Sequence, residues 1–253
     1  MCKVRRTLIS VRHVGVQYRL RRGLLKRKQF WALKDVSFDL YHAESLGVIG
    51  RNGCGKTTLL KVLAGITQPD VGSVTHNGCR AALLALNVGF VPYLTGRENA
   101  TLGGLMLGFS RREIESRLGA IADFAELGEF FDEPMFEYSA GMKARLGFSV
   151  ACQLDSDVLL IDEVLGVGDA EFRRKSTAVL RDKIKSEKTV VVVSHDPNTI
   201  RRLCDRAVWI ENGRARCEGT AEDVLLQYEA ALRHGAPAER AERDQGTAKA
   251  KRV

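Results

Sequence analysis

The amino-acid sequence predicts an α/β fold with an antiparallel β subdomain at its N-terminal side and a helical subdomain inserted into its core. Three features predict this arrangement. Apolar residues alternate along the first 40 residues, a glycine-rich loop joins a short apolar strand to a helix, and strands alternate with helices after residue 157. The 253 residues are enough to bury a full α/β core.

The N-terminal region is expected to form antiparallel strands with one buried face, because its apolar residues alternate. The alternating positions are Leu8, Val14, Val16 and Tyr18, followed by Val36, Phe38 and Leu40. Residues 44–49 then form a short buried strand that leads into the glycine loop. A helix is expected over residues 57–64, with Gly65 and Pro69 stopping it.

Residues 96–154 show helical patterns and no convincing strand, so they are expected to form a helical subdomain inserted between strands of the core. Charges interleave with apolar residues over residues 111–127, which predicts one helix, and residues 144–154 form a second, apolar helix.

Strands and helices alternate again toward the C-terminus. Strands are expected at residues 158–161 and 189–194, and helices at residues 170–186 and 198–204. Two further short strands pair across Asn212-Gly213, a dipeptide typical of type I′ hairpins. A closing helix follows over residues 220–233, with Thr220 as its N-cap.

The formal charge of +8 is unevenly distributed. Eleven of the 39 Lys and Arg residues lie at or before Lys34, where there is no Asp or Glu, and they are densest in residues 19–28. This segment is either a solvated hairpin loop or a patch facing anionic lipid headgroups or an anionic substrate. Nucleic acid is not expected as a partner, because no recognised binding module accompanies the patch.

The six cysteines are scattered without CxxC pairs or clustered histidines. This pattern argues against a zinc site or a disulfide framework and favours a reducing cytosol. The N-terminus lacks the apolar segment of a signal peptide, and the aliphatic runs are too short to span a bilayer. If the protein acts in transport, the pore is expected to be another chain.

Residues 50–57, GRNGCGKT, match the phosphate-binding pattern GxxxxGK[ST] and form the P-loop of this chain. Glycines let the backbone wrap around phosphates, Lys56 is expected to reach the β- and γ-phosphates, and the Thr57 hydroxyl is expected to bind Mg²⁺. The nucleotide-binding candidates are Gly50, Asn52, Gly53, Cys54, Gly55, Lys56, Thr57 and Thr58. The pattern lies between an expected strand and an expected helix, as this chemistry requires.

Four further residues are candidates for the same site. Asp162 ends an apolar strand and is expected to complete the Mg²⁺ shell, while Glu163 is positioned to orient and polarise an attacking water. His195 follows a buried strand, so it is either a turn residue or a hydrogen-bond partner of the transferred phosphoryl group. Tyr18 is either a stacking partner for the adenine or a core aromatic.

A second phosphate cradle is predicted at Ser139, which would N-cap a helix that begins near Gly141. Its hydroxyl, the free amides and the helix dipole together attract anionic oxygens. One chain has no obvious need for two cradles facing one γ-phosphate, whereas two copies do.

These motifs, in this order over about residues 7–231, resemble the ATP-binding-cassette (ABC) ATPases, with residues 138–142 as the signature sequence. The amino-acid sequences of these motifs are similar to those of ATPase subunits of bacterial exporters for lipid-linked O-antigen, capsule or teichoic acid. The phrases that carry this resemblance are FWALKDVSF at residues 30–38, LTGREN at residues 94–99, YSAGMKARLGFSV at residues 138–150 and DEVLGVGDAEF at residues 162–172.

The resemblance implies an ATPase that powers polysaccharide export as a homodimer beneath a separate integral membrane permease, at the cytoplasmic face of the inner or plasma membrane. ATP and Mg²⁺ would lie between the P-loop of one subunit and Ser139 and Gly141 of the other, with Asp169 at the dimer seam. Lys56, Glu163 and His195 would be the catalytic residues. Residues 1–233 would form the ABC ATPase domain, with its helical subdomain at about 96–154, and residues 234–253 a disordered tail.

The sequence departs from the general family pattern at two places. Ala140 and Met142 replace a glycine and a glutamine of the signature, and the loop that usually carries a Mg²⁺-sensing Gln or Glu reads ALN at residues 85–87. Longer relatives also append a carbohydrate-binding domain. The alternatives are an ABC exporter ATPase for a drug or lipid, a soluble ABC protein outside transport, and a non-hydrolysing adaptor.

Overall fold

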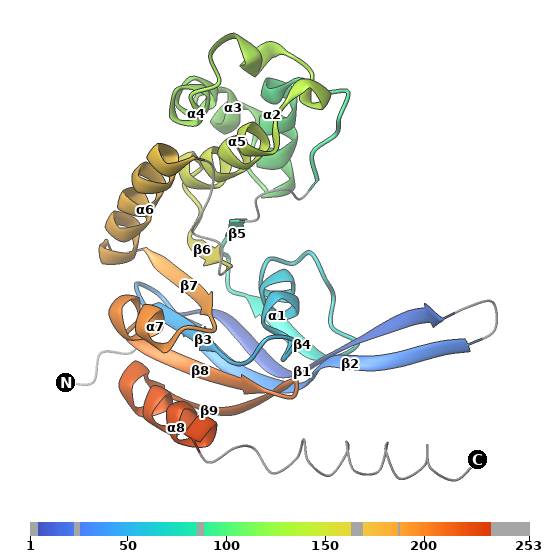
Figure 1. The fold of residues 1–253 in the computed structure, drawn as a ribbon, viewed down its shortest axis with the longest axis vertical. Coiled ribbons are helices and arrows are strands. Elements are labelled where there is room, and N and C mark those ends of the chain that lie inside the picture. The colour runs from blue at the N-terminus through green and yellow to red at the C-terminus, as the bar shows by residue number, and fades with distance from the viewer. Residues whose placement is uncertain (1–4, 23–25, 85–88, 163–168, 187, 234–253) are drawn as a thin grey trace.

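The computed structural model describes residues 5–22, 26–84, 89–162, 169–186 and 188–233, with only the backbone described at residues 20–22, 26–28 and 185. Within these residues, nine strands form one sheet in the order β4-β1-β2-β9-β8-β3-β7-β6-β5. Figure 1 shows this sheet with helices on its faces and a separate group of helices at one end.

The antiparallel pair predicted at the N-terminus is confirmed. β1 (Thr7–Arg22) pairs with β2 (Lys26–Tyr41), and β4 (Val71–His76) pairs with the other edge of β1. β4 pairs with β1 only as far as Gly15, so the two long strands continue past it as a ribbon that extends beyond the rest of the sheet (Figure 1). Residues 19–22 and 26–28 of the basic segment lie on this ribbon, and an anionic partner of the segment stays a prediction.

The other half of the sheet is mainly parallel. β3 (Ser45–Ile49) lies between β7 (Thr189–Ser194) and β8 (Arg206–Glu211), and β6 (Val158–Ile161) lies between β7 and β5 (Ala81–Leu84). The ladder pairs Ile49 with Ser194 and Ile161 with Val192. The carboxyl ends of β3, β6 and β7 therefore meet at one edge, where ligands of open α/β sheets bind.

The hairpin predicted at Asn212-Gly213 is confirmed, since it joins β8 to β9 (Arg214–Thr220) with φ values of 51° and 78°. The carbonyl oxygen of Gly213 accepts a hydrogen bond of 2.7 Å from the Lys34 amide of β2. α8 (Ala221–Arg233) closes the chain's described part, with Thr220 Oγ1 accepting from the Asp223 amide at 3.2 Å.

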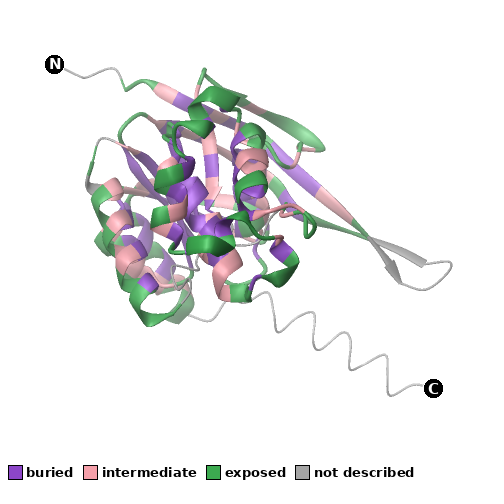
Figure 2. Cartoon of the chain, turned by 90° about the horizontal axis from the view of Figure 1, so that it is seen from above, coloured by how far each residue is buried: buried purple, intermediate pink, exposed green. Residues whose placement is uncertain are grey.

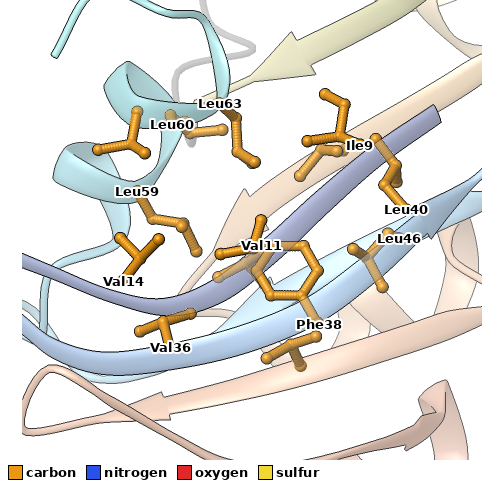
Figure 3. Packing of buried hydrophobic residues seen from close by; sticks show 14 of the residues in the cluster. Ile9, Val11, Val14, Val36, Phe38, Leu40, Leu46, Leu59, Leu60 and Leu63 are labelled. Atoms are coloured by element: carbon orange, nitrogen blue, oxygen red, sulfur yellow. The ribbon is translucent and has the colours of Figure 1, made fainter. Parts of the chain in front are cut away.

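The main core lies between the antiparallel strands and α1 (Lys56–Leu63), the helix that follows β3. Figure 3 shows Leu59, Leu60 and Leu63 of α1 directed toward Val11 and Val14 of β1. Figure 2 shows how the buried residues gather inside the body while the outer faces of the helices remain exposed. This packing fixes the start of α1, and with it the end of the glycine loop.

Most of the helical stretch forms its own core, while part of its last helix packs into a core shared with the parallel strands. The stretch consists of α2 (Gly96–Met106), α3 (Arg111–Glu115), α4 (Leu118–Ala125), two 3₁₀ turns at Gly128–Asp132 and Met135–Glu137, and α5 (Ala140–Gln153). The division of the chain into domains stays a prediction.

The prediction of one continuous helix over residues 111–127 is wrong, because the helix is interrupted between α3 and α4. The Ser116 hydroxyl donates to the Glu113 carbonyl at 2.7 Å, and the Arg117 amide bonds to Ile114 three residues back at 2.8 Å. Local side-chain bonds of this kind compete with the helical ladder. α5 also begins four residues before the apolar pattern at residue 144.

α6 (Ala170–Lys185) and α7 (Pro197–Leu203) confirm the helices predicted in the C-terminal half. β4 and β5 are two strands that the sequence pattern misses. β4 is almost wholly exposed and β5 is a run of only four apolar residues, so neither shows the alternation of apolar and polar residues that marks a strand in the sequence. Among the described residues, no helix combines the length and apolar character of a membrane span.

Three phenylalanines, each packed against the other two, join the helical region to α6, and one of them is Phe148. Its ring centroid lies 5.9 Å from that of Phe124 and 5.8 Å from that of Phe172. We predict that Phe148→Ala lowers the free energy of unfolding by about 3–5 kcal/mol, because it opens a cavity among packed rings. Urea unfolding measures this. The matched control Phe130→Ala, at a ring that is 49% exposed, is expected to change it by less than about 0.5 kcal/mol.

Candidate nucleotide-binding site

The P-loop runs between β3 and α1 and is pressed against neighbouring backbone. A Cβ on Gly50 would lie 2.3 Å from the Ile210 carbonyl oxygen, and one on Gly55 would lie 2.4 Å from that of Ala32. Gly53 and Gly55 also have φ values of 80° and 110°, which L side chains rarely adopt. Gly50 is therefore required for space, Gly53 for conformation, and Gly55 for both.

The N-terminus of α1 is open to an anion. Its N-cap is Gly55, so no side chain caps it in the described structure. The first-turn amides of such a helix carry the positive end of the helix dipole and bind phosphate oxygens. The loop therefore fits a phosphate chain, as the sequence predicts.

Lys56 lies folded along this loop. Its Nζ donates to the carbonyl oxygens of Gly50 at 2.7 Å and Arg51 at 3.1 Å, and the side chain is buried. The ammonium group is thus held where phosphates would enter the loop. Cys54, also buried, keeps a neutral thiol because burial raises its pKa above the ordinary value.

Thr57 and Asp162, the two predicted Mg²⁺ ligands, come together. Thr57 Oγ1 lies 3.2 Å from Asp162 Oδ2, although β6, which carries the aspartate, lies two strands away from β3. A hydroxyl oxygen and a carboxylate oxygen are ligands that suit Mg²⁺ beside nucleotide phosphates. The donor set therefore fits this ion. Glu163 lies outside the described residues, as does the ALN sequence at residues 85–87.

His195 follows β7 at the same edge of the sheet, and its side chain is exposed. The next residue, Asp196, N-caps α7 by accepting from the amides of Asn198 at 3.1 Å and Thr199 at 3.0 Å. The cap at Asp196 thus accounts for the turn. His195 lies beside the end of β3, because the preceding residue, Ser194, pairs with Ile49.

The second cradle has the local structure that the sequence predicts. Ser139 is the N-cap of α5, and its hydroxyl accepts from the Met142 amide at 3.1 Å. Ser139 is exposed, and Gly141 leaves only the Ser139 hydroxyl, 3.7 Å away, near its missing Cβ. Figure 1 shows that α5 lies within the group of helices at one end of the molecule, whereas α1 lies against the sheet. The two cradles are therefore not joined within one chain.

Asp169 is the N-cap of α6, where its carboxylate accepts from the amides of Phe172 at 2.9 Å and Glu171 at 3.1 Å. The hydrogen bond from Phe172 is the main reason that the pKa of Asp169 lies below its usual value. Arg145 of α5 lies 3.9 Å from this carboxylate and so links α5 to the start of α6. Sequence reasoning missed Arg145, although it belongs to the phrase at residues 138–150.

Tyr18 lies on β1 with its ring centroid 5.7 Å from that of Phe30, and it packs partly buried against the main core. This placement is compatible with a core aromatic. Stacking on an adenine stays a prediction.

The ABC transporter family model matches residues 33–166. The O-antigen export system ATP-binding protein RfbB of Klebsiella pneumoniae is 47% identical over 209 residues, which cover 83% of this chain and 85% of that protein. The teichoic acids export ATP-binding protein TagH of Shouchella clausii is 42% identical over 204 residues, covering 81% of this chain and 56% of that protein.

Among solved structures, the dimeric post-hydrolysis ATP-binding cassette MJ0796 bound to ADP and Pi superimposes with a TM-score of 0.66 at 23% identity. The match covers 84% of this chain and 98% of that one. It confirms the predicted fold class, and the family and relatives confirm the resemblance noted in the sequence. The chain belongs to the ABC transporter family.

Proposed function

We propose that this protein is the ATP-hydrolysing subunit of a transporter that exports a lipid-linked surface polysaccharide through a separate membrane permease. The approach of Thr57 and Asp162 beside the P-loop carries the ATPase part of this proposal. The names of the relatives, which export O-antigen and teichoic acids, support the class of cargo.

When bound, ATP would supply the phosphoryl group, and Mg²⁺ would neutralise part of the negative charge on its phosphates. The P-loop amides and Lys56 hold the phosphates, and Thr57 and Asp162 hold the metal. Glu163 orients the attacking water and accepts its proton, and His195 donates a hydrogen bond to a γ-phosphate oxygen. The roles of Lys56, Thr57, Asp162 and His195 follow from residue type and from the shared edge of the sheet, and the role of Glu163 follows from its residue type and its place directly after Asp162 in the sequence.

Two copies of the chain complete each site. Ser139 and Asp169 both lie exposed at the start of a helix, and Arg145 of α5 lies 3.9 Å from the Asp169 carboxylate. Exposed helix starts with a hydroxyl cap attract anions, so the α5 start of one subunit suits the γ-phosphate held by the P-loop of the other. A homodimer with two shared ATP sites results.

An exposed aromatic pair supports docking to a permease. Tyr93 is 83% exposed and Phe136 is 57% exposed, and their ring centroids lie 6.4 Å apart. Large apolar side chains that gather at a surface mark interaction sites. Docking on a permease through this pair would hold the subunit at the cytoplasmic face of the membrane.

We predict that Thr57→Val raises the Mg²⁺ concentration needed for half-maximal ATP hydrolysis by about tenfold or more, because valine keeps the shape but lacks the ligand oxygen. Mg²⁺ titration of phosphate release measures this. Thr57→Ser keeps the hydroxyl and should retain the wild-type dependence. An identical Mg²⁺ dependence in Thr57→Val and in the wild type would show that Thr57 does not bind the metal.

Glu163→Gln is predicted to bind ATP but to hydrolyse it at least about a hundredfold more slowly, because the amide cannot accept the proton of the water. The variant should then accumulate as an ATP-bound dimer, which light scattering after gel filtration detects. Glu171→Gln, at an exposed position of α6, is the matched control. Wild-type turnover in Glu163→Gln would exclude Glu163 as the base.

Deleting the gene should leave a lipid-linked glycan inside the cell, and the wild-type gene should restore it to the surface. Tyr93→Ala combined with Phe136→Ala should keep ATPase activity but neither co-purify the permease nor restore export. Leu226→Ala, at a leucine of α8 that is 56% exposed, is the control. An unchanged glycan surface after deletion would contradict the proposed cargo.

A further inference from the structure

The LTGREN phrase and Tyr138 meet in the structure, although neither has a role in the chemistry described above. The segment at residues 91–97 runs beside the segment at residues 130–138, which leads into the signature. Three backbone hydrogen bonds join them: Met135 to Leu94 at 2.9 Å, Phe136 to Pro92 at 2.9 Å and Gly96 to Glu133 at 3.2 Å.

Tyr138 directly precedes Ser139 of the signature, and its side chain anchors the chain at this point. Its side chain is only 4% exposed, and its hydroxyl donates to the carbonyl oxygen of Phe130 at 2.5 Å. Burial, together with the nearby charges of Asp132 and Glu133, raises the pKa of Tyr138 to about 12. The hydroxyl therefore remains a hydrogen-bond donor at any physiological pH.

Gly96 supplies the space that this hydroxyl occupies. A Cβ at Gly96 would lie 2.1 Å from the Tyr138 hydroxyl oxygen and 2.9 Å from the Phe131 carbonyl oxygen. Gly96 is the first residue of α2 and is not among the residues with positive φ. The backbone there accepts any residue, so the glycine is needed for space rather than for conformation.

Asn99 makes the facing segment rigid. It is almost wholly buried, and its Nδ2 donates to the carbonyl oxygens of Leu94 at 3.0 Å and Thr95 at 2.9 Å. Its Oδ1 accepts from the Val91 amide at 2.7 Å. A buried amide with all these partners fixes the loop around it.

We propose that Tyr138, Gly96 and Asn99 form a lock that holds Ser139 and the first-turn amides of α5 in place for the nucleotide of the partner subunit. Tyr138 acts here as a positioning residue, since its hydroxyl touches backbone and no reacting group. The lock rests on the proposed shared site of the homodimer. Hydrogen-bond donors aimed at a phosphate are effective only when their positions are fixed in advance.

The test measures ATP-driven dimerisation in the Glu163→Gln background by analytical ultracentrifugation with MgATP. Adding Tyr138→Phe should weaken dimerisation by about tenfold, because the loss of the hydroxyl removes the hydrogen bond to the Phe130 carbonyl and frees the segment before Ser139. Binding of a fluorescent ATP analogue to the monomer should stay within about twofold, because the P-loop lies elsewhere. A folding defect would lower both.

Tyr41→Phe, which removes a hydroxyl at the end of β2, is the matched control and should dimerise like the parent. Gly96→Ala should weaken dimerisation, because its methyl group takes the place of the Tyr138 hydroxyl. In Gly96→Ala/Tyr138→Phe that conflict is smaller, so the double variant should be less impaired than the product of the two single effects.

The outcomes are distinct. If the Glu163→Gln parent dimerises with ATP and Tyr138→Phe dimerises equally well, the lock is wrong and the proposed homodimer stands. Single effects that simply multiply in the double variant also overturn the lock. If the parent does not dimerise with ATP, the shared site fails, and the lock fails with it.

Discussion

The rest of the structure depends on one close contact, in which the P-loop lies directly on the backbone of the strands beside it. Ala32 of β2 is at the centre of this contact. Its carbonyl oxygen would be 2.4 Å from a Cβ on Gly55 and 2.9 Å from a Cβ on Gly213. Two turns from distant parts of the sequence therefore close on the same peptide group. Because each turn has a glycine there, the antiparallel strands, the P-loop and the β8–β9 hairpin can pack closely together at this point.

That contact sets the chemistry of the site. Once the loop is fixed, α1 must begin at Lys56, whose ammonium group turns back to the loop carbonyls, while Thr57 faces the end of β6. The carboxylate of Asp162 arrives there because β3, β7 and β6 are in parallel register. The two oxygens proposed to bind Mg²⁺ thus come together from residues more than 100 positions apart, as the carboxyl edge of a parallel sheet allows.

Local features of the fold and site were predictable, and long-range ones were not. The Asn212-Gly213 hairpin, the Ser139 cap and the P-loop each follow from bonds within a few residues, so the residue types alone predict them. The position of β2 beside β9 rests on pairing at Asp35 and Arg214, which no sequence pattern records. The break at Ser116 went unpredicted because an apolar period continued across it while a hydroxyl bond ended the helix.

The two phosphate cradles differ in what makes them rigid. The P-loop is rigid because glycines let it lie on the main sheet, so its support is the large core beneath α1. The start of α5 belongs to the smaller helical core, whereas residues farther along α5, such as Phe148 and Cys152, pack into the core beside β6. At the start of α5, the buried hydroxyl of Tyr138 and the buried amide of Asn99 add hydrogen bonds to this packing. Buried polar side chains therefore support the start of α5, whereas close glycine contacts support the start of α1.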